Sequence, residues 1–163
     1  MTKTERLTKF LDLSATLTAF GVFELNGTGQ AEAYLATVEE VIGEDLLDDV
    51  LETYERLRGQ AQKDASELRR LLRREIFADE KLGPIARNII KLWYAGAWYE
   101  LPSAWREVFG TSENDFTHMV SPASYTEGLL WPTIGANPNG AKAPGYGSWV
   151  LPPRIPAADG SVP

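Results

Sequence analysis

Apolar residues recur at helical spacing through most of the first hundred positions of this chain, and this periodicity restricts the fold more than any other feature. Positions three or four residues apart share one face of a helix, whereas runs that alternate as a strand would are few and brief. The pattern predicts an all-α fold, a small helical bundle of about five helices. We place these helices at residues 7–20, 28–42, 45–58, 61–76 and 83–99, with a short additional helix at 103–109.

Glycine, proline and capping residues set the expected boundaries of these helices. Thr28 is suited to cap the second helix, because its hydroxyl can accept a hydrogen bond from the first backbone amides. Gly59 is expected to end the third helix. Pro84 fits the first turn of the fifth helix, which should continue to Tyr99 before Pro102 stops it.

The composition changes at about residue 121. Of the 10 prolines, 8 lie between Ser121 and Pro163, together with 6 of the 14 glycines and only four charged residues. Aromatic residues are spread among them, whereas disordered linkers are usually rich in charge and poor in aromatics. The sequence therefore predicts a long, extended, Pro/Gly/aromatic-rich C-terminal arm at 121–163, which packs on the bundle of residues 1–120, on a partner, or on both.

Such an arm needs a surface to become ordered. Fixing about 30 residues costs on the order of 45 kcal/mol at about 1.5 kcal/mol per residue, which corresponds to roughly 1,800 Å² of apolar burial. Four aromatic rings of about 150–250 Å² each supply about half of this area. We therefore interpret the arm as an interaction element, with residues 121–153 as its main docking segment.

The second half of the fifth predicted helix carries aromatic residues on all sides. At about 100° per residue, Trp93, Tyr94, Trp98 and Tyr99 spread around the whole circumference. A helix that is apolar all round is either central in the bundle or covered by something else, and the arm or a partner subunit is the expected cover. The predicted partner-binding residues are therefore Trp93, Tyr94, Trp98 and Tyr99 in the helix and Tyr125, Trp131, Lys142, Tyr146 and Trp149 in the arm.

Charge and composition argue against several classes of function. The formal net charge is −7, with 23 acidic and 16 basic residues, which argues against a nucleic-acid partner because phosphate backbones bind concentrated basic surfaces. The sequence has no cysteine, and therefore neither a disulfide nor a thiolate metal site. No run of about 18 apolar residues occurs, so we expect no membrane-spanning helix.

Three further patterns invite a chemical interpretation, and each has a plainer one. His118, the one histidine, has apolar neighbours, a setting more often structural than catalytic. The acidic run between Glu39 and Glu52 lacks the ligand spacing of a calcium loop and favours a solvated helix face. The only basic cluster lies on the outer arc of the fourth helix, where acidic neighbours favour surface ion pairs over an acidic partner. Its members are Arg69, Arg70, Arg73 and Arg74.

Four segments, in combination, resemble a known family. They are Phe10–Ser14 with Leu17–Phe20; Leu25–Gly29 leading to Tyr34; Lys91–Gly96; and Ser124–Trp131 with Ile134–Ala136 and Gly140–Lys142. Together these segments are similar to the small subunit of membrane-bound FAD-dependent sugar and polyol dehydrogenases, namely the sorbitol, fructose and glucose dehydrogenases. The resemblance covers nearly the whole chain.

The resemblance implies a non-catalytic companion with no catalytic, cofactor or metal residue of its own. In that family a large flavoprotein of the glucose–methanol–choline class holds FAD and oxidises the sugar, often with an iron–sulfur cluster and a cytochrome subunit that takes the electrons. The small subunit stabilises, matures or escorts it. Family members commonly carry a twin-arginine leader, which Met1–Phe10 does not resemble, so the expected location is periplasmic if a leader has been removed and cytoplasmic otherwise.

Two hypotheses of other classes remain open. The first is a self-contained enzyme, such as a hydrolase that uses His118 with a nearby carboxylate. The second is a homo-oligomer with a structural role, in which identical chains exchange their C-terminal arms.

Overall fold

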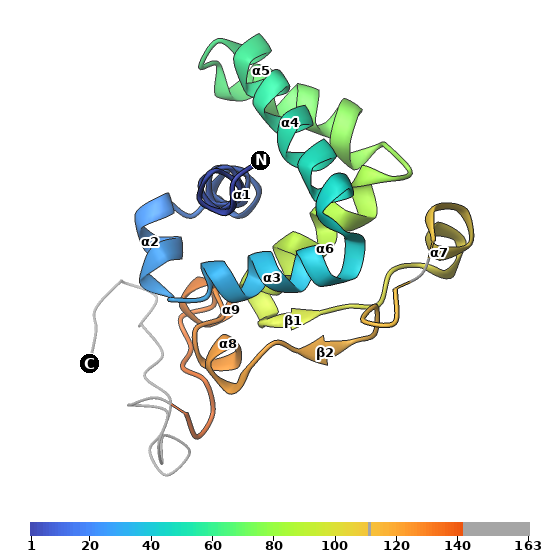
Figure 1. The fold of residues 1–163 in the computed structure, drawn as a ribbon. Coiled ribbons are helices and arrows are strands. Elements are labelled where there is room, and N and C mark those ends of the chain that lie inside the picture. The colour runs from blue at the N-terminus through green and yellow to red at the C-terminus, as the bar shows by residue number, and fades with distance from the viewer. Residues whose placement is uncertain (111, 142–163) are drawn as a thin grey trace. The chain divides into compact units, whose positions relative to one another are not determined.

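The computed structural model describes residues 1–110 and 112–141 (Figure 1). These residues are mostly helical, which confirms the predicted helical character of the chain. The chain divides into two compact units, Met1–Leu129 and Leu130–Pro163. The first unit thus continues to Leu129, past the boundary that we expected at residue 120. Lys142, Tyr146 and Trp149 of the predicted arm lie outside the described residues.

Helices supply nearly all regular structure of the first unit. In chain order they are α1 Lys3–Thr18, α2 Val22–Gly27, α3 Ala31–Ile42, α4 Glu44–Ala61, α5 Ala65–Leu72, the π-helix η1 Arg73–Phe77, α6 Leu82–Ala95, α7 Ser103–Phe109 and α8 Pro122–Thr126. The strands β1 Ala97–Trp98 and β2 His118–Met119 pair antiparallel, with Trp98 opposite His118. In the second unit the structure describes one helix, α9 Leu130–Thr133.

The core of the first unit lies between α1, α3, α4 and α6. In Figure 1, α1 is seen along its axis, and it contacts each of the other three helices. Most of the core side chains come from the apolar faces that the periodicity predicted, and all of them are almost fully buried. The largest are Phe10, Leu13, Tyr34, Leu35, Leu47, Leu51, Leu57, Ile85 and Trp93. Burial of each such side chain contributes about 1.5–3 kcal/mol, so this shared core is the main source of stability of the unit.

Two of the expected boundaries are wrong. The Thr28 hydroxyl donates to the carbonyl of Leu25 (2.7 Å) and accepts from the amide of Gln30 (3.2 Å), so it closes the turn after α2 and does not cap α3. Gly59 does not end α4, which continues to Ala61. A glycine inside a helix costs only about 0.5–1 kcal/mol relative to alanine, which the buried face of α4 outweighs.

The fifth predicted helix is also shorter than expected. α6 ends at Ala95, and Gly96 closes it in the left-handed conformation (φ 70°), with its amide bonded to the carbonyl of Leu92. This conformation suits glycine and turns the chain out of the helix. Trp98 therefore lies in β1, and Tyr99 follows it, so the expectation of one helix with an aromatic surface all round is wrong.

The described part of the arm is not extended over residues 122–133, where α8 and α9 form two short helices. Ser121 caps α8, because its hydroxyl accepts from the amide of Ser124 (3.0 Å), and Pro122 occupies the first helical position. The predictions for residues 142–163 of the arm lie outside the described part of the chain.

Part of the acidic run is not a solvated face. Arg6 of α1 is 5% exposed, and its guanidinium binds Asp48 through two hydrogen bonds (2.7 and 3.0 Å) and Glu39 through one (3.1 Å). Glu44 lies 3.1 Å from the same guanidinium. The bond to Arg6 lowers the pKa of the Asp48 carboxyl and raises that of the guanidinium. These three carboxylates therefore attach α3 and α4 to α1.

Candidate partner-binding surface

One residue from each of the four segments that carry the family resemblance takes part in a cluster of contacts around Trp93, near the end of α6. The Trp93 ring stacks on Phe10 (6.3 Å between centroids) and meets Tyr34 edge-on (4.9 Å). The carbonyl of Trp93 accepts from the amide of Leu129 (2.9 Å). These contacts take one residue from each segment, so the residues behind the resemblance also build the centre of this chain's own fold.

The next residue, Tyr94, extends this cluster towards the end of α1. Its ring meets Phe20 edge-on (6.1 Å), and its hydroxyl donates to the carbonyl of Thr18 (3.0 Å). Tyr94 is half-buried. It therefore contributes to the packing of the bundle and keeps only part of its surface for any other contact.

Residues 120–129, which we call the strap, close the end of α6. The carbonyl of Gly96 accepts from the amide of Val120 (3.0 Å) and from the hydroxyl of Ser124 (2.7 Å). Ser124 and Leu129 are 0% and 3% exposed. The last carbonyls of a helix have no partner within the helix, and here the strap supplies partners to those of Trp93 and Gly96. This part of the predicted arm packs on its own bundle.

The predicted partner-binding residues separate into groups. Trp93 and Trp98 are 1% and 0% exposed, so we correct their assignment: both are core residues with no surface for a partner. Tyr99 is 38% exposed, with the Lys91 ammonium 4.8 Å from its ring centroid, and Tyr125 of the strap is half-buried. Trp131 belongs to the second unit, where its carbonyl accepts from the amide of Ala136 (2.9 Å).

The structure brings forward a surface that the sequence reasoning largely missed. The segment from β1 through α7 to β2, residues 97–119, carries several large apolar side chains that are exposed. They are Tyr99, Val108 (71%), Phe109 (37%), Phe116 (53%) and Met119 (46%). We call this set the apolar segment. Of its members only Tyr99 is among the predicted partner-binding residues; Phe116 and Met119 are the apolar neighbours of His118, and Val108 and Phe109 lie in the short helix expected at 103–109.

Buried polar contacts hold the apolar segment in place. Asp115 is 6% exposed and accepts from the indole N–H of Trp98 (2.9 Å) and from the amide of Leu101 (3.1 Å). The indole N–H of Trp105 in α7 donates to the carbonyl of Lys81 (2.8 Å), and the Phe109 ring packs on Trp105 (5.4 Å). The exposed side chains are therefore presented from a fixed scaffold.

His118 lies on β2, within this segment. Its Nδ1 is 2.8 Å from the carbonyl oxygen of Phe116, and its ring contacts the Phe116 ring (4.6 Å between centroids). No Asp or Glu of residues 1–110 and 112–141 forms an ion pair with this ring. Among the described residues, the backbone carbonyl of Phe116 is therefore the group that orients the imidazole of His118.

The arginines of α5 and η1 form the ion pairs that we expected in two cases out of four. Arg70 binds Glu67 through two hydrogen bonds (2.8 and 2.6 Å), and Arg74 binds Glu75 (2.5 Å). Arg69 and Arg73 pair with no carboxylate of the described residues. These two side chains are therefore available to other anions.

Comparisons with known proteins add no assignment, since no protein-family model, curated protein or solved structure matches the chain. In the part of the chain that the structure describes, no three or more His, Asp or Glu side chains are grouped as metal ligands would be. Every helix there is too short or too polar to cross a bilayer.

Proposed function

We propose that this chain is a non-catalytic accessory subunit that binds an FAD-dependent sugar or alcohol dehydrogenase of the glucose–methanol–choline class and stabilises, matures or escorts it. FAD, and any iron–sulfur cluster, belong to that partner. The resemblance of four segments supports the kind of partner. The observation that carries the binding role is the apolar segment, with Phe116, Met119 and Val108 about half or more exposed.

Aromatic and methionine side chains that are exposed in the free protein are typical of surfaces that become the buried centre of an interface in the complex. Complete burial of such a side chain contributes about 1.5–3 kcal/mol, so covering the exposed parts of the five side chains of the apolar segment offers several kcal/mol to an interface. Asp115 and Trp105 fix the segment before binding, which lowers the entropy lost when a partner docks.

The accessory role follows from mass action. A subunit that binds only the folded flavoprotein adds RT ln(1 + [L]/Kd) to its stability, which is about 2.7 kcal/mol when the subunit is present at 100 times its Kd. We further propose that a twin-arginine leader, where the natural chain carries one, takes the assembled pair to the periplasm. Neither step requires a catalytic group in this chain.

The test is co-expression of the full chain with a glucose–methanol–choline flavoprotein from the same genome. We expect a yellow complex that stays together on a sizing column, and a flavoprotein that unfolds at a higher temperature in the complex than alone. Phe116→Ser combined with Met119→Ser should weaken the complex. Phe23→Ser is the matched control, because Phe23 is 90% exposed on another element, α2.

Three results would reject the proposal. The two proteins could elute separately, the flavoprotein could be equally stable alone, or the Phe23 variant could weaken the complex as much as the Phe116/Met119 variant. Loss of a measurable hydrolase activity in His118→Ala would favour the self-contained enzyme instead. A solution mass of two chains, without any flavoprotein bound, would favour the exchange of arms between identical chains.

A further inference from the structure

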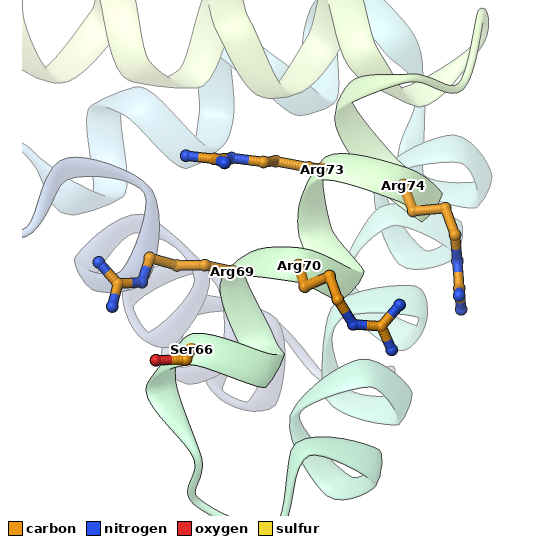
Figure 2. Close-up of a pocket in the computed structure, with 5 residues that line it drawn as sticks. All are labelled: Ser66, Arg69, Arg70, Arg73 and Arg74. Carbon is orange, nitrogen blue, oxygen red and sulfur yellow. The ribbon is translucent and has the colours of Figure 1, made fainter.

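A shallow hollow lies on the exposed face of α5 and η1. Its volume is about 540 Å³, and its lining is formed by one serine and four arginines. Figure 2 shows these residues, Ser66, Arg69, Arg70, Arg73 and Arg74. All five are exposed to solvent, and positive charge is concentrated here on a chain whose formal net charge is −7.

The side chains of this hollow divide into two sets. In Figure 2, Arg70 and Arg74 extend to one side of the helix, while Ser66, Arg69 and Arg73 extend to the other. Arg70 and Arg74 are neutralised by their ion pairs with glutamates. The other side thus presents one hydroxyl and two guanidinium groups, from residues spaced three and four positions apart along the helix.

The two guanidinium groups on that side have no carboxylate partner among the described residues. The Arg69 guanidinium donates only to the carbonyl of Ala65 (3.2 Å), and the Arg73 guanidinium forms no hydrogen bond or ion pair with any described residue. Of the other described arginines, Arg87 donates to the carbonyl of Phe77 (2.8 Å), and six pair with carboxylates, namely Arg6, Arg56, Arg58, Arg70, Arg74 and Arg106. Carboxylates are in excess in this sequence, so a shortage of acidic residues does not explain why Arg69 and Arg73 lack an acidic partner.

The backbone at this point is irregular as well. η1 follows α5 directly at Arg73 and ends at Phe77, so the last turn of this helical stretch is a π-helix. Short π-helical segments are rare and occur frequently at functional sites. Asp64, two residues before Ser66, accepts from the backbone amides of Ser66 (2.8 Å) and Glu67 (3.2 Å), so hydrogen bonds already occupy it as the cap of α5.

We propose that Ser66, Arg69 and Arg73 form a binding site for a phosphate group. A guanidinium presents its N–H groups as a fork that matches two phosphate oxygens, and a serine hydroxyl can donate to a third oxygen. Because the hollow is open to solvent, the phosphate can belong to a small phosphorylated molecule or to the headgroup of an anionic phospholipid. This site is independent of the accessory role proposed above.

The test uses the full chain at low ionic strength, where exposed charges are least screened. Calorimetric titration with inorganic phosphate examines the free anion. Flotation with vesicles of phosphatidylglycerol, against vesicles of phosphatidylcholine, examines the headgroup. Arg69→Gln combined with Arg73→Gln should weaken binding at least about tenfold, because a hydrogen bond to a charged group contributes about 1.5–3 kcal/mol and tenfold corresponds to about 1.4 kcal/mol.

Two controls make the result decisive. Lys3→Gln with Lys91→Gln removes the same charge from exposed positions on other elements and should leave binding within about twofold of the wild type. Far-ultraviolet circular dichroism checks that each variant is folded. Binding of phosphate alone supports a site for a small phosphorylated molecule, and binding of phosphatidylglycerol vesicles supports a headgroup site. Absence of both, or equal loss in the lysine and arginine variants, would overturn the proposal.

Discussion

Gly96 is the position where one methyl group should do the most damage, because the strap crosses it at very short range. A Cβ at residue 96 would lie 2.5 Å from the carbonyl carbon of Ser124 and closer still to its oxygen. Both are backbone atoms, which cannot rotate away as the end of a long side chain can. Alanine at this position must therefore displace the strap or distort the end of α6.

The cost can be worked out from two contributions. The left-handed conformation of residue 96 costs alanine about 1 kcal/mol. Displacing the strap also breaks the two hydrogen bonds to the Gly96 carbonyl, from Val120 and Ser124, at about 1 kcal/mol each. The expected total is about 3 kcal/mol, which lowers the melting temperature by about 6–12 °C for a domain of this size.

Thermal unfolding followed by circular dichroism measures this effect, and Gly29→Ala is its matched control. Gly29 has almost the same conformation (φ 67°), but no heavy atom lies within 4 Å of the position of an added Cβ. Gly29→Ala should therefore lose only about 1 kcal/mol, or about 2–4 °C. Hydrogen exchange adds a local readout, since the amides of Val120 and Leu129 should lose protection only in the Gly96 variant.

Equal melting temperatures for the Gly96 and Gly29 variants would refute this reasoning, because the clash with Ser124 would then cost nothing beyond backbone strain. Unchanged protection of the Val120 and Leu129 amides would refute it as well. Such a result would mean that the strap does not rest on Gly96 in solution.

Three further predictions concern the buried polar contacts. Asp115→Asn places an amide group among the donors of Trp98 and Leu101 and should lower the free energy of unfolding by about 1–3 kcal/mol in urea denaturation; an unchanged midpoint would contradict the contacts. Arg6→Met leaves the half-buried Glu39 and Asp48 carboxylates without the guanidinium that binds them and should cost about 1.5–3 kcal/mol by the same measurement, whereas a loss below about 1 kcal/mol would show a solvated network. Arg6 lowers the folded-state pKa of Asp48, so the stability that this pair contributes is complete above the unfolded pKa of about 3.9 and is lost as the pH falls through the folded pKa. Asp48→Asn should therefore flatten the acid side of the plot of unfolding free energy against pH. An unaltered plot would count against this role of Asp48.

Helical content was predictable because it depends on local periodicity. The helix expected at 103–109 agrees with α7, Ser103–Phe109, since Pro102 and Gly110 mark both ends in the sequence itself. Gly59 and Gly96 show the limit of this reasoning. Each glycine comes after a run of residues with helical apolar periodicity, yet Gly59 lies inside α4 and Gly96 ends α6. The difference arises because only at Gly96 do the strap and β2 form hydrogen bonds with the chain that leaves the helix.

The candidate surface was less predictable than the fold, because a dense group of aromatic residues suits a core as well as an interface. Trp98 and Tyr99 are neighbours in sequence, but the Trp98 side chain of β1 is buried, whereas that of Tyr99, directly after the strand, is 38% exposed. Arg6 finds its carboxylates more than thirty positions away, so no local pattern could have indicated that pairing. The exposure of Phe116 and Met119 likewise depends on where β2 pairs.

The strap also determines when the first unit can finish folding during synthesis of the chain. The ring neighbours of Trp93 lie in α1 and α3, which leave the ribosome before α6 does. The carbonyl of Trp93, however, accepts its hydrogen bond from the amide of Leu129, which is synthesised later. A nascent chain that has not yet exposed residue 129 holds a bundle with an open end and unsatisfied carbonyls at α6. Completion of the first unit is therefore a late event of synthesis, and a shortened version should keep every residue up to Leu129.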